Sequence, residues 1–326
     1  MNELGAFQNV FDGIEPFKGM VPAGFLIDPF GQLTEAEFRT IWLDDPDCDH
    51  DRKIETAMPA AITDEGWFEV VNWVEAAREA RDSYVMMTLG ACYGAQAVGS
   101  YLALQKINPM PALLVAVEGV ADNVEWVNRQ FRNNGIDPDE HWIIEAALSS
   151  DNQPVLFPVG GAGLGNQSSL TLNSREGREQ LAKSILDTGQ GDAALTNILT
   201  TNGTGVRVEL IPDVDHDTSA ELRLVSAITL KNLLAPFKRI DFIEADLQFA
   251  EISTIPPVIE ELTRKVRRIH LGTHSDQIHE SMVSLFQGFG WEIVFSYLPH
   301  RSFETPYGSW TNDDGVLTVV NPALAY

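Results

Sequence analysis

Residues 87–94 read Met87-Thr88-Leu89-Gly90-Ala91-Cys92-Tyr93-Gly94, and Glu118 ends the next apolar run 24 positions after Gly94. Glycines at the first turn between a strand and a helix let the backbone approach a nucleotide-like ligand closely. An acidic side chain at the end of the second strand can accept hydrogen bonds from ribose hydroxyls. Parallel sheets bind their ligands at the carboxyl ends of the strands, where both features fall. Together they predict a cofactor that contains adenosine.

The segments on both sides of this turn alternate between apolar runs and helical patterns. We predict strands over residues 84–89, 113–118, 142–148, 240–246, 266–271, 291–298 and 315–320. We predict helices over residues 67–81, 95–106, 121–134 and 276–289, with two more near 176–186 and after Pro256-Pro257. This alternation indicates right-handed βαβ units. The predicted fold class is therefore α/β, with a Rossmann-like, mostly parallel sheet of about seven strands.

Two parts of the chain interrupt this alternation. Residues 1–65 are rich in Pro, Gly and Asp with short apolar bursts, and we predict an irregular N-terminal extension there. Residues 66–326 are predicted to form one domain with an insertion at about 160–220, which is rich in Gly, Asn, Thr and Ser. Loops of this length in compact domains are typically lids, binding loops or disordered segments.

The charge of the chain limits its partners. It has 47 acidic residues against 22 lysines and arginines, a formal net charge of −25. Such a charge repels phosphate backbones and anionic lipid surfaces, so we expect neither nucleic acid nor a membrane as partner. No apolar run reaches the roughly 20 residues of a membrane-spanning helix. The chain starts without a signal-peptide pattern, and Cys48 and Cys92 form no CxxC pair, so we expect a cytoplasmic protein.

The glycine pattern disfavours two phosphate-binding motifs. A dinucleotide fingerprint would need glycine where Cys92 and Ala95 stand, and no P-loop Gly-Lys-Ser/Thr is present. Residues 160–165, Gly-Gly-Ala-Gly-Leu-Gly, have no basic residue or helix start close behind them. We predict a flexible loop there, since isolated glycine clusters mainly form turns. A phosphate-free adenosine cofactor therefore fits better than a dinucleotide.

Five motifs, in order, make the chain resemble the FkbM-type methyltransferases, a branch of the class I S-adenosylmethionine-dependent enzymes. Residues 89–94 are similar to the first motif of that family, LGAxxG, and residues 115–118 to its acidic second motif. Residues 145–149 resemble its adenine-side segment. Residues 240–251 are similar to its fourth-strand motif, iDxxxxDxQGaE, and residues 269–275 to its fifth-strand motif, hiGTHs.

The resemblance implies S-adenosyl-L-methionine as the cofactor and a sheet whose last strand is antiparallel. The residues that it implies for cofactor binding are Gly90, Ala91, Gly94, Glu118, Ala147 and Asp246. It also implies O-methylation of a hydroxyl on a sugar or another small-molecule natural product. The expected partner is thus a small-molecule or glycan acceptor. The identity of the acceptor and the formation of a homo-oligomer stay open.

Two residues are candidates for catalysis. His274 ends the fifth strand, and a neutral imidazole can take a hydroxyl proton near neutral pH. Asp246, at the end of the fourth strand, is the alternative proton acceptor. His270 lies in mid-strand and is predicted to be a packed core histidine, whereas His279 is predicted on a helix surface.

A metal requirement is not predicted. If a divalent cation is used, Asp246, Gln248 and Glu251 are its candidate ligands, because such ions prefer oxygen donors. Two acidic clusters, residues 45–51 and 213–217, lack both the glycine and the closing glutamate of a calcium loop. We predict that both clusters are solvated loops.

Two positions depart from the family pattern. Thr88 stands where many members have Asp or Glu, and Phe249 stands where they have Gly. The first departure changes a polar contact expected near the methionine end of the cofactor. The second places a large side chain at the opening of the predicted site, beside Asp246. The alternative function is therefore a catalytically impaired, methyltransferase-like binding or scaffold protein. A nicotinamide oxidoreductase is a third candidate, which the broken glycine fingerprint disfavours.

Overall fold

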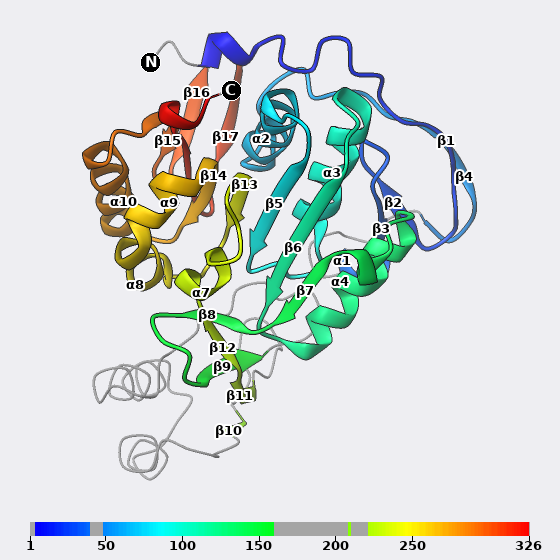
Figure 1. The fold of residues 1–326 in the computed structure, drawn as a ribbon. Helices are drawn as coiled ribbons and strands as arrows, with labels where there is room; N and C mark the ends of the chain where they lie inside the picture. Colours follow the sequence, from blue (N-terminus) through cyan, green and yellow to red (C-terminus); the bar gives the residue numbers. More distant parts are fainter. Residues whose placement is uncertain (1–3, 40–47, 160–207, 210–220, 326) are drawn as a thin grey trace.

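The computed structural model describes residues 4–39, 48–159, 208–209 and 221–325. Its centre is one seven-stranded sheet (Figure 1). In sheet order the strands are β15 (Glu292–Tyr297), β18 (Gly315–Val320), β14 (Val266–Thr273), β13 (Ile240–Ala245), β5 (Tyr84–Leu89), β6 (Ala112–Glu118) and β7 (Trp142–Glu145). Strand β18 runs antiparallel to both neighbours, and the other neighbouring pairs are parallel. The predicted fold class is confirmed: the sheet is mostly parallel, and its last strand along the chain is antiparallel.

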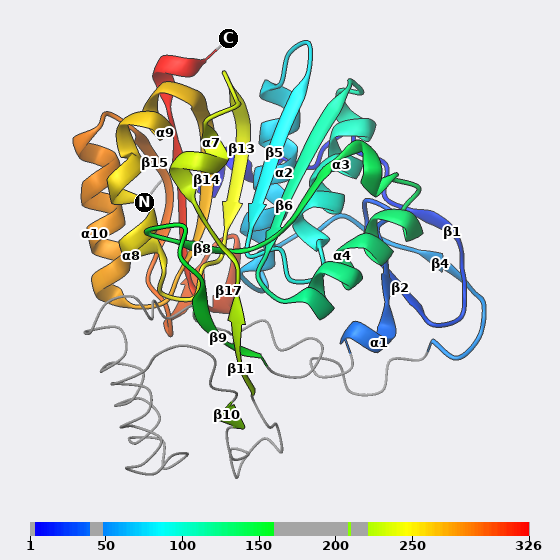
Figure 2. The same cartoon turned by 60° about the horizontal axis from the view of Figure 1, so that its bottom comes forward.

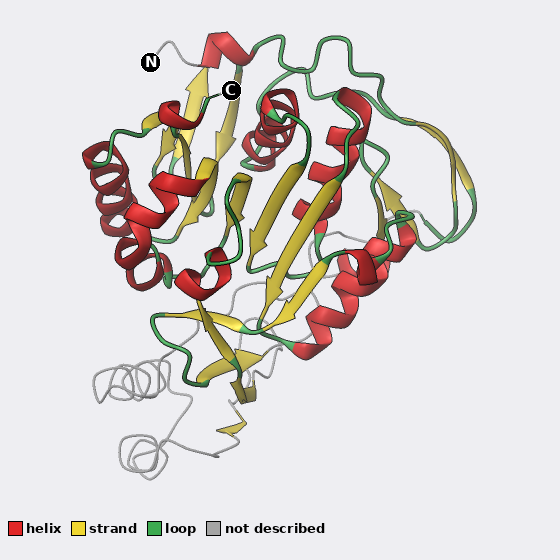
Figure 3. Ribbon diagram, viewed as in Figure 1, coloured by secondary structure: helices red, strands yellow, loops and turns green. Residues whose placement is uncertain are grey.

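Helices cover both faces of this sheet (Figure 3). One face carries α2 (Gly66–Glu79), α3 (Ala95–Ile107) and α4 (Ala121–Asn133). The other carries α7 (Leu230–Leu234), α8 (Glu251–Thr254), α9 (Ile259–Lys265) and α10 (Asp276–Gly288). Successive strand residues point to opposite faces, so Met86 packs in the first core and Met87 in the second. Burial on both faces explains why the central strands are almost entirely apolar.

The N-terminal 65 residues contain short elements that pack onto the first face. They are the 3₁₀ turn η1 (Leu4–Phe7), the strand pairs β1 (Lys18–Val21) with β4 (Arg52–Glu55) and β2 (Phe25–Ile27) with β3 (Leu33–Glu35), and α1 (Ala36–Arg39). Phe11 and Phe30 are buried against α2, where their rings meet Trp67 and Trp73 edge-on. Because of this packing, residues of the extension border the site described below.

The predicted third strand, residues 142–148, is wrong in its second half. Strand β7 ends at Glu145, and β8 (Ala147–Ser149) leaves the sheet to pair in parallel with β12 (Ala227–Thr229). The break lies at Ala146, whose amide donates to the Glu118 carbonyl, while the Ala147 amide donates to Ser226. The partner strand is about eighty positions away along the chain, so no local pattern could indicate this pairing.

Further small elements lie beyond the carboxyl ends of the central strands (Figure 2). Strands β9 (Val155–Val159), β11 (Glu221–Val225) and β10 (Val208–Glu209) form an antiparallel sheet. Elsewhere, β16 (Ser302–Thr305) pairs with β17 (Gly308–Thr311), a hairpin that we did not predict. The remaining 3₁₀ turns are η2 (Pro138–Glu140), η3 (Pro256–Val258) and η4 (Pro322–Leu324). The predictions for residues 160–165, 176–186 and 213–217 lie outside the described residues.

Within the described part of the chain, no helix is both long enough and apolar enough to cross a membrane.

A buried polar network joins α2 to the strands β14 and β18. The Asn72 amide nitrogen donates to Phe68 O at 2.8 Å and to Thr318 Oγ1 at 2.9 Å, and it lies 3.1 Å from His270 Nδ1. Its oxygen accepts from Arg268 at 3.2 Å. His270 is 4% exposed, and burial lowers its pKa to about 4. The prediction that His270 is a packed core histidine is confirmed.

The prediction that His279 lies on a helix surface is wrong. The side chain is 2% exposed, and its ring nitrogens lie 2.9 Å from Thr273 Oγ1 and 2.9 Å from Ser296 Oγ. Helix α10 turns this face towards β14 and β15, where two hydroxyl groups satisfy both nitrogens. Hydroxyl partners from separate strands make such burial tolerable.

We expect Asn72→Ala to lower the free energy of unfolding by about 1–3 kcal/mol, because it leaves buried donors and acceptors without partners. Asn128→Ala is the matched control, since Asn128 also donates to a carbonyl four residues earlier but is only partly buried. We expect the control to lie within about 0.5 kcal/mol of the parent protein. Urea unfolding measures both, and equal losses would contradict a network that joins helix to sheet.

Candidate functional site

The turn after β5 requires glycine at position 90. Gly90 has φ +86°, and a Cβ there would lie 2.1 Å from the carbonyl oxygen of Asp246. The amides of Gly90 and Ala91 donate to Val117 O at 3.0 and 2.9 Å. Gly94, also at φ +86°, begins helix α3. The turn is thereby held against both β6 and the loop after β13.

The Glu118 carboxylate joins this turn to the next one. It accepts from the Cys92 amide and from the Val120 amide, each at 2.8 Å, and lies 3.5 Å from the Asn123 amide nitrogen. Burial raises its pKa, and these hydrogen bonds oppose the rise. Glu118 is thus fixed by its own protein donors at the point where it lines the cavity.

A cavity of about 910 Å³ opens at the carboxyl edge of the sheet, beside the glycine turn. Gly90, Ala91, Glu118, Ala147 and Asp246 all line it. Ala147 lies there because β8 leaves the sheet beneath the turn after β6, where a Cβ on Gly119 would be 3.3 Å from the Ala147 Cβ. Gly94 is not among the described residues that line the cavity, since it faces Val127 and Phe131.

The wall of the cavity is strongly acidic. Its acidic residues in the described part of the chain are Asp28, Asp64, Glu65, Glu69, Glu118, Glu244, Asp246, Asp313 and Asp314. Among the described residues, one arginine, Arg39, and one histidine, His300, also line it. Burial raises the pKa of Asp28 and of Asp314 to about 6, and burial together with Asp314 raises that of Glu65 to about 7. Such a wall attracts cationic groups and repels phosphates.

Thr88 supports a carboxyl group from the neighbouring strand. Its hydroxyl donates to Glu244 Oε2 at 2.6 Å, and the two residues are register partners on β5 and β13. Burial, together with the charge of Glu69, raises the pKa of Glu244 well above its usual value. Burial also raises the pKa of Glu69, which lines the cavity from α2. The acidic group absent at position 88 is therefore present one strand away.

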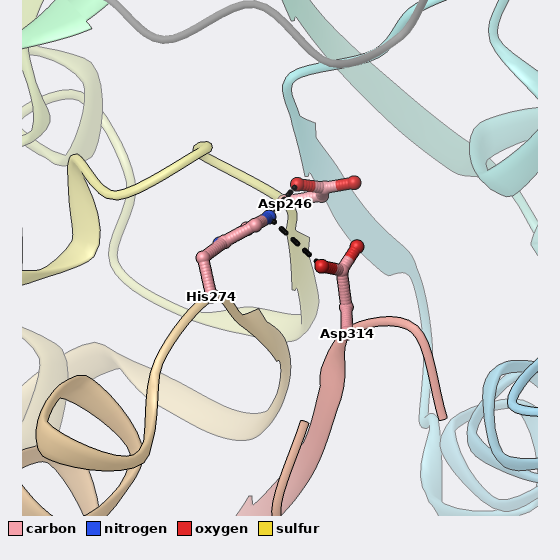
Figure 4. Close-up of side chains that lie close together, drawn as sticks. All are labelled: Asp246, His274 and Asp314. Atoms are coloured by element: carbon pink, nitrogen blue, oxygen red, sulfur yellow. Dashed lines mark ion pairs between the residues drawn. The ribbon is translucent and has the colours of Figure 1, made fainter. Parts of the chain in front are cut away.

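Three side chains from separate loops meet beside this wall (Figure 4). His274 follows β14, Asp246 follows β13 and Asp314 precedes β18. His274 Nε2 lies 3.1 Å from Asp246 Oδ1 and 3.5 Å from Asp314 Oδ1. On the other side of the ring, Nδ1 lies 3.0 Å from Oε1 of the fully buried Glu251. The predicted pair Asp246 and His274 is thus in contact, and Asp314 joins it.

The imidazole of His274 is held among negative charges. Burial alone would lower its pKa, but the adjacent carboxylates of Asp246 and Glu251 outweigh burial and raise the pKa to about 10. In this arrangement both ring nitrogens carry hydrogen near neutral pH. The role of His274 as a base stays a prediction, and it requires the ring to lose a proton first.

The three predicted cation ligands do not converge on one point. Asp246 belongs to the cluster with His274 and Asp314, whose ligand atoms all lie within 4.8 Å of one another. Gln248 instead donates to Asp246 Oδ1 at 2.8 Å, and Glu251 accepts from the Leu247 amide at 3.1 Å from behind His274. Glu251 and Gln248 thus orient the cluster rather than belong to it.

Phe249 has a left-handed backbone conformation, which favours glycine. Its φ is +77°, next to Gln248 at φ +48°, and two such residues in succession store strain. The ring is 51% exposed and lies 5.3 Å from the His274 ring, measured between centroids. It is not among the described residues that line the cavity. The ring therefore covers the cluster from outside and leaves the cavity beside the glycine turn open.

Several residues of the site were not predicted from the sequence. Glu69 could have been noticed as an acid within the predicted helix 67–81, next to its apolar positions, and Glu244 as an acid inside an apolar strand. Asp314 directly precedes a predicted strand, and no local signal marks it. Its place is set by Glu65, whose carboxylate accepts from the amides of Asp313 and Asp314 at 3.2 Å each.

Comparison with known proteins gives one curated relative. Over 233 residues the chain is 24% identical to a protein of Jannaschia sp. (strain CCS1) named "Putative methyltransferase", covering 69% of each chain. No family model matches the chain. The resemblance to the FkbM type therefore stays a prediction.

Solved structures give distant likenesses. Precorrin-6y C5,15-methyltransferase from Geobacter metallireducens GS-15 is 8% identical, with 81% of this chain and 92% of that chain covered and a TM-score of 0.39. Fibrillarin from Aeropyrum pernix, solved with S-adenosyl-L-methionine, is 9% identical, with 84% and 80% covered and a TM-score of 0.35. Likenesses this distant support no inference about what the chain binds.

We expect Phe249→Gly to be more stable than Phe249→Ala by roughly 1 kcal/mol, because only glycine adopts φ +77° without strain. Phe289 is the matched control, since it is similarly exposed but has φ −102°. There the alanine variant should be at least as stable as the glycine variant. Urea unfolding of the four variants measures this, and the same order at both positions would refute strain at Phe249.

Proposed function

We propose that the chain is an S-adenosylmethionine-dependent methyltransferase. The observation that carries this proposal is an acidic cavity placed directly against the glycine turn and Glu118. S-adenosylmethionine bears a sulfonium and an ammonium group but no phosphate, so an acidic wall favours it over a dinucleotide. The curated relative named as a methyltransferase agrees with this assignment.

In this proposal the cofactor lies across Gly90 and Ala91, with its ribose hydroxyls on Glu118 and its adenine towards Ala147. These residues border one cavity. Gly94 contributes through the turn that it ends rather than by contact. Glu69 and Glu244 would hold the cationic methionine end, since they supply the acidic groups that position 88 lacks.

The acceptor in this proposal is a hydroxyl of a sugar or another small molecule, placed beside Asp246. S-adenosylmethionine bound there would supply a methyl group on a positively charged sulfur. An acceptor oxygen could then bond to the methyl carbon while the sulfur–carbon bond breaks to leave neutral S-adenosylhomocysteine. The hydroxyl proton passes to the Asp246 side of the cluster, which is 40% exposed and can return it to solvent. Alignment of the oxygen, the carbon and the sulfur contributes more to such a displacement than proton transfer does.

The alternative, an impaired binding or scaffold protein, relied on Thr88 and Phe249. Both departures leave the site geometry in place, since Thr88 supports Glu244 and Phe249 lies outside the cavity. A nicotinamide oxidoreductase would have to bind a pyrophosphate against the acidic wall. We therefore favour the methyltransferase. The exclusion of nucleic acid as acceptor stays a prediction from net charge.

Calorimetric titration with S-adenosylmethionine, S-adenosylhomocysteine and NAD tests the class. We expect micromolar dissociation constants for the two sulfur compounds and no heat with NAD, because only NAD brings a pyrophosphate to the acidic wall. Binding of NAD alone would replace the proposal by the oxidoreductase. Binding of none of the three would favour the scaffold protein.

Glu118→Gln should weaken S-adenosylhomocysteine binding roughly tenfold or more, because a hydrogen bond to a charged acceptor contributes about 1.5–3 kcal/mol. Glutamine is chosen over alanine because it keeps the side-chain size and one acceptor oxygen, which can serve either the Cys92 amide or the Val120 amide, since the two amides donate to different oxygens of Glu118. Glu145→Gln is the matched control, since Glu145 is the exposed register partner of Glu118 on β7. Equal dissociation constants for both variants, with unchanged thermal unfolding, would remove Glu118 from the cofactor site.

A further inference from the structure

The histidine of the cluster has no satisfactory hydrogen bond. The His274 side chain is 4% exposed, and neither of its ring nitrogens has a partner of acceptable hydrogen-bond geometry. Carboxylate oxygens nevertheless lie 3.0–3.5 Å from both nitrogens. Buried polar atoms are nearly always hydrogen-bonded. Carboxylate oxygens that lie this close to the ring nitrogens, but in directions that do not allow hydrogen bonds, therefore need an explanation.

We propose that Asp246, His274 and Asp314 bind a divalent transition-metal ion such as Mn²⁺. Ligand atoms about 2.1 Å from one ion lie roughly 3.0 Å apart in an octahedron and 3.4 Å apart in a tetrahedron. The separations of 3.1 and 3.5 Å between Nε2 and the two carboxylates match these values. In addition, the lone pairs of two atoms that bind one ion point at the ion and not at each other. Shared coordination therefore explains the two contacts at Nε2, which are close without being hydrogen bonds.

The surroundings of His274 fit a metal ligand. Histidines that bind metals usually direct their other ring nitrogen to a carboxylate, which orients the ring. Glu251 Oε1 lies 3.0 Å from Nδ1, is fully buried, and is held by the Leu247 amide. Gln248 donates to Asp246 Oδ1 and fixes the second ligand in the same way. Binding of an ion has to displace the Nε2 proton, since a histidine ligand is neutral at the nitrogen that binds the metal. The resulting donor set of one imidazole and two carboxylates suits ions of the Mn²⁺ type.

The ion would be open to an acceptor. The side chains of Asp246 and Asp314 are 40% and 32% exposed, and both line the cavity, whereas His274 is buried behind them. Three protein ligands leave positions on the ion for oxygen atoms from the cavity side. An ion here would hold a hydroxyl oxygen next to the glycine turn, because Gly90 lies against the Asp246 backbone. This last step rests on the proposed methyltransferase function, whereas binding of the ion does not.

Titration of chelator-treated protein with Mn²⁺, followed by calorimetry and electron paramagnetic resonance, tests the site. We expect one ion per chain, and echo modulation from a directly bound imidazole nitrogen. Asp314→Asn should weaken binding at least tenfold, because it removes a charged ligand without changing side-chain size. Asp313→Asn is the matched control: it removes the same charge one residue away, and its amide also donates to Glu65. The control should stay within about twofold of the parent protein.

The control matters because a chain of net charge −25 attracts cations everywhere on its surface. Absence of a stoichiometric site, equal weakening by both variants, or absence of nitrogen modulation would each overturn the metal site. S-adenosylhomocysteine is titrated separately in the presence of chelator. Binding of that compound without a Mn²⁺ site would overturn only the metal proposal, and a Mn²⁺ site without binding of the compound would overturn only the methyltransferase.

Discussion

The close approach of Gly90 to the Asp246 carbonyl determines how this site is built. The space that a Cβ would need at position 90 is taken by that oxygen, and the Asp246 amide donates back to Leu89 O at 3.0 Å. These contacts exist because β5 and β13 are adjacent parallel strands that end at the same level. The glycine turn and the cluster around Asp246 are thus positioned by the sheet itself, and their separation does not depend on a flexible loop. Such rigidity suits the in-line displacement that we propose for this site, because it fixes the two substrates relative to each other.

The concentration of carboxyl groups at this edge opposes folding. Burial raises the pKa of Glu69, Glu118 and Glu244, which means that their charged forms are less stable here than in water. Local donors offset part of this cost, since two backbone amides serve Glu118 and the Thr88 hydroxyl serves Glu244. A cationic ligand would offset more. Buried carboxyl groups of this kind lower the stability of the fold and concentrate acidic groups in one place. Such an arrangement is typical of a functional site rather than of structural packing.

Much of the fold could be predicted because local pattern and tertiary environment agree. The run Tyr84–Leu89 is apolar except for Thr88 since both of its faces are buried, and the glycines after it mark the turn. Prediction failed where the partners of a residue or strand lie far away along the chain or on other strands. Strand β8 pairs with residues some eighty positions away, and His279 finds hydroxyl partners on two other strands. Asp246 and His274 could be selected from the sequence because each ends a strand. Asp314 could not, because its place depends on Glu65, which lies 249 positions earlier.

The two departures from the family pattern illustrate the difference between a motif along the chain and a site in space. Thr88 lacks a carboxyl group, yet its register partner Glu244 brings one to its hydroxyl. Phe249 lacks the freedom of glycine, yet its backbone adopts the left-handed conformation, and it is not among the described residues that line the cavity. The chemical group expected from a motif position can come from a residue that lies next to it in space. A motif position is therefore best judged together with its neighbours in the fold.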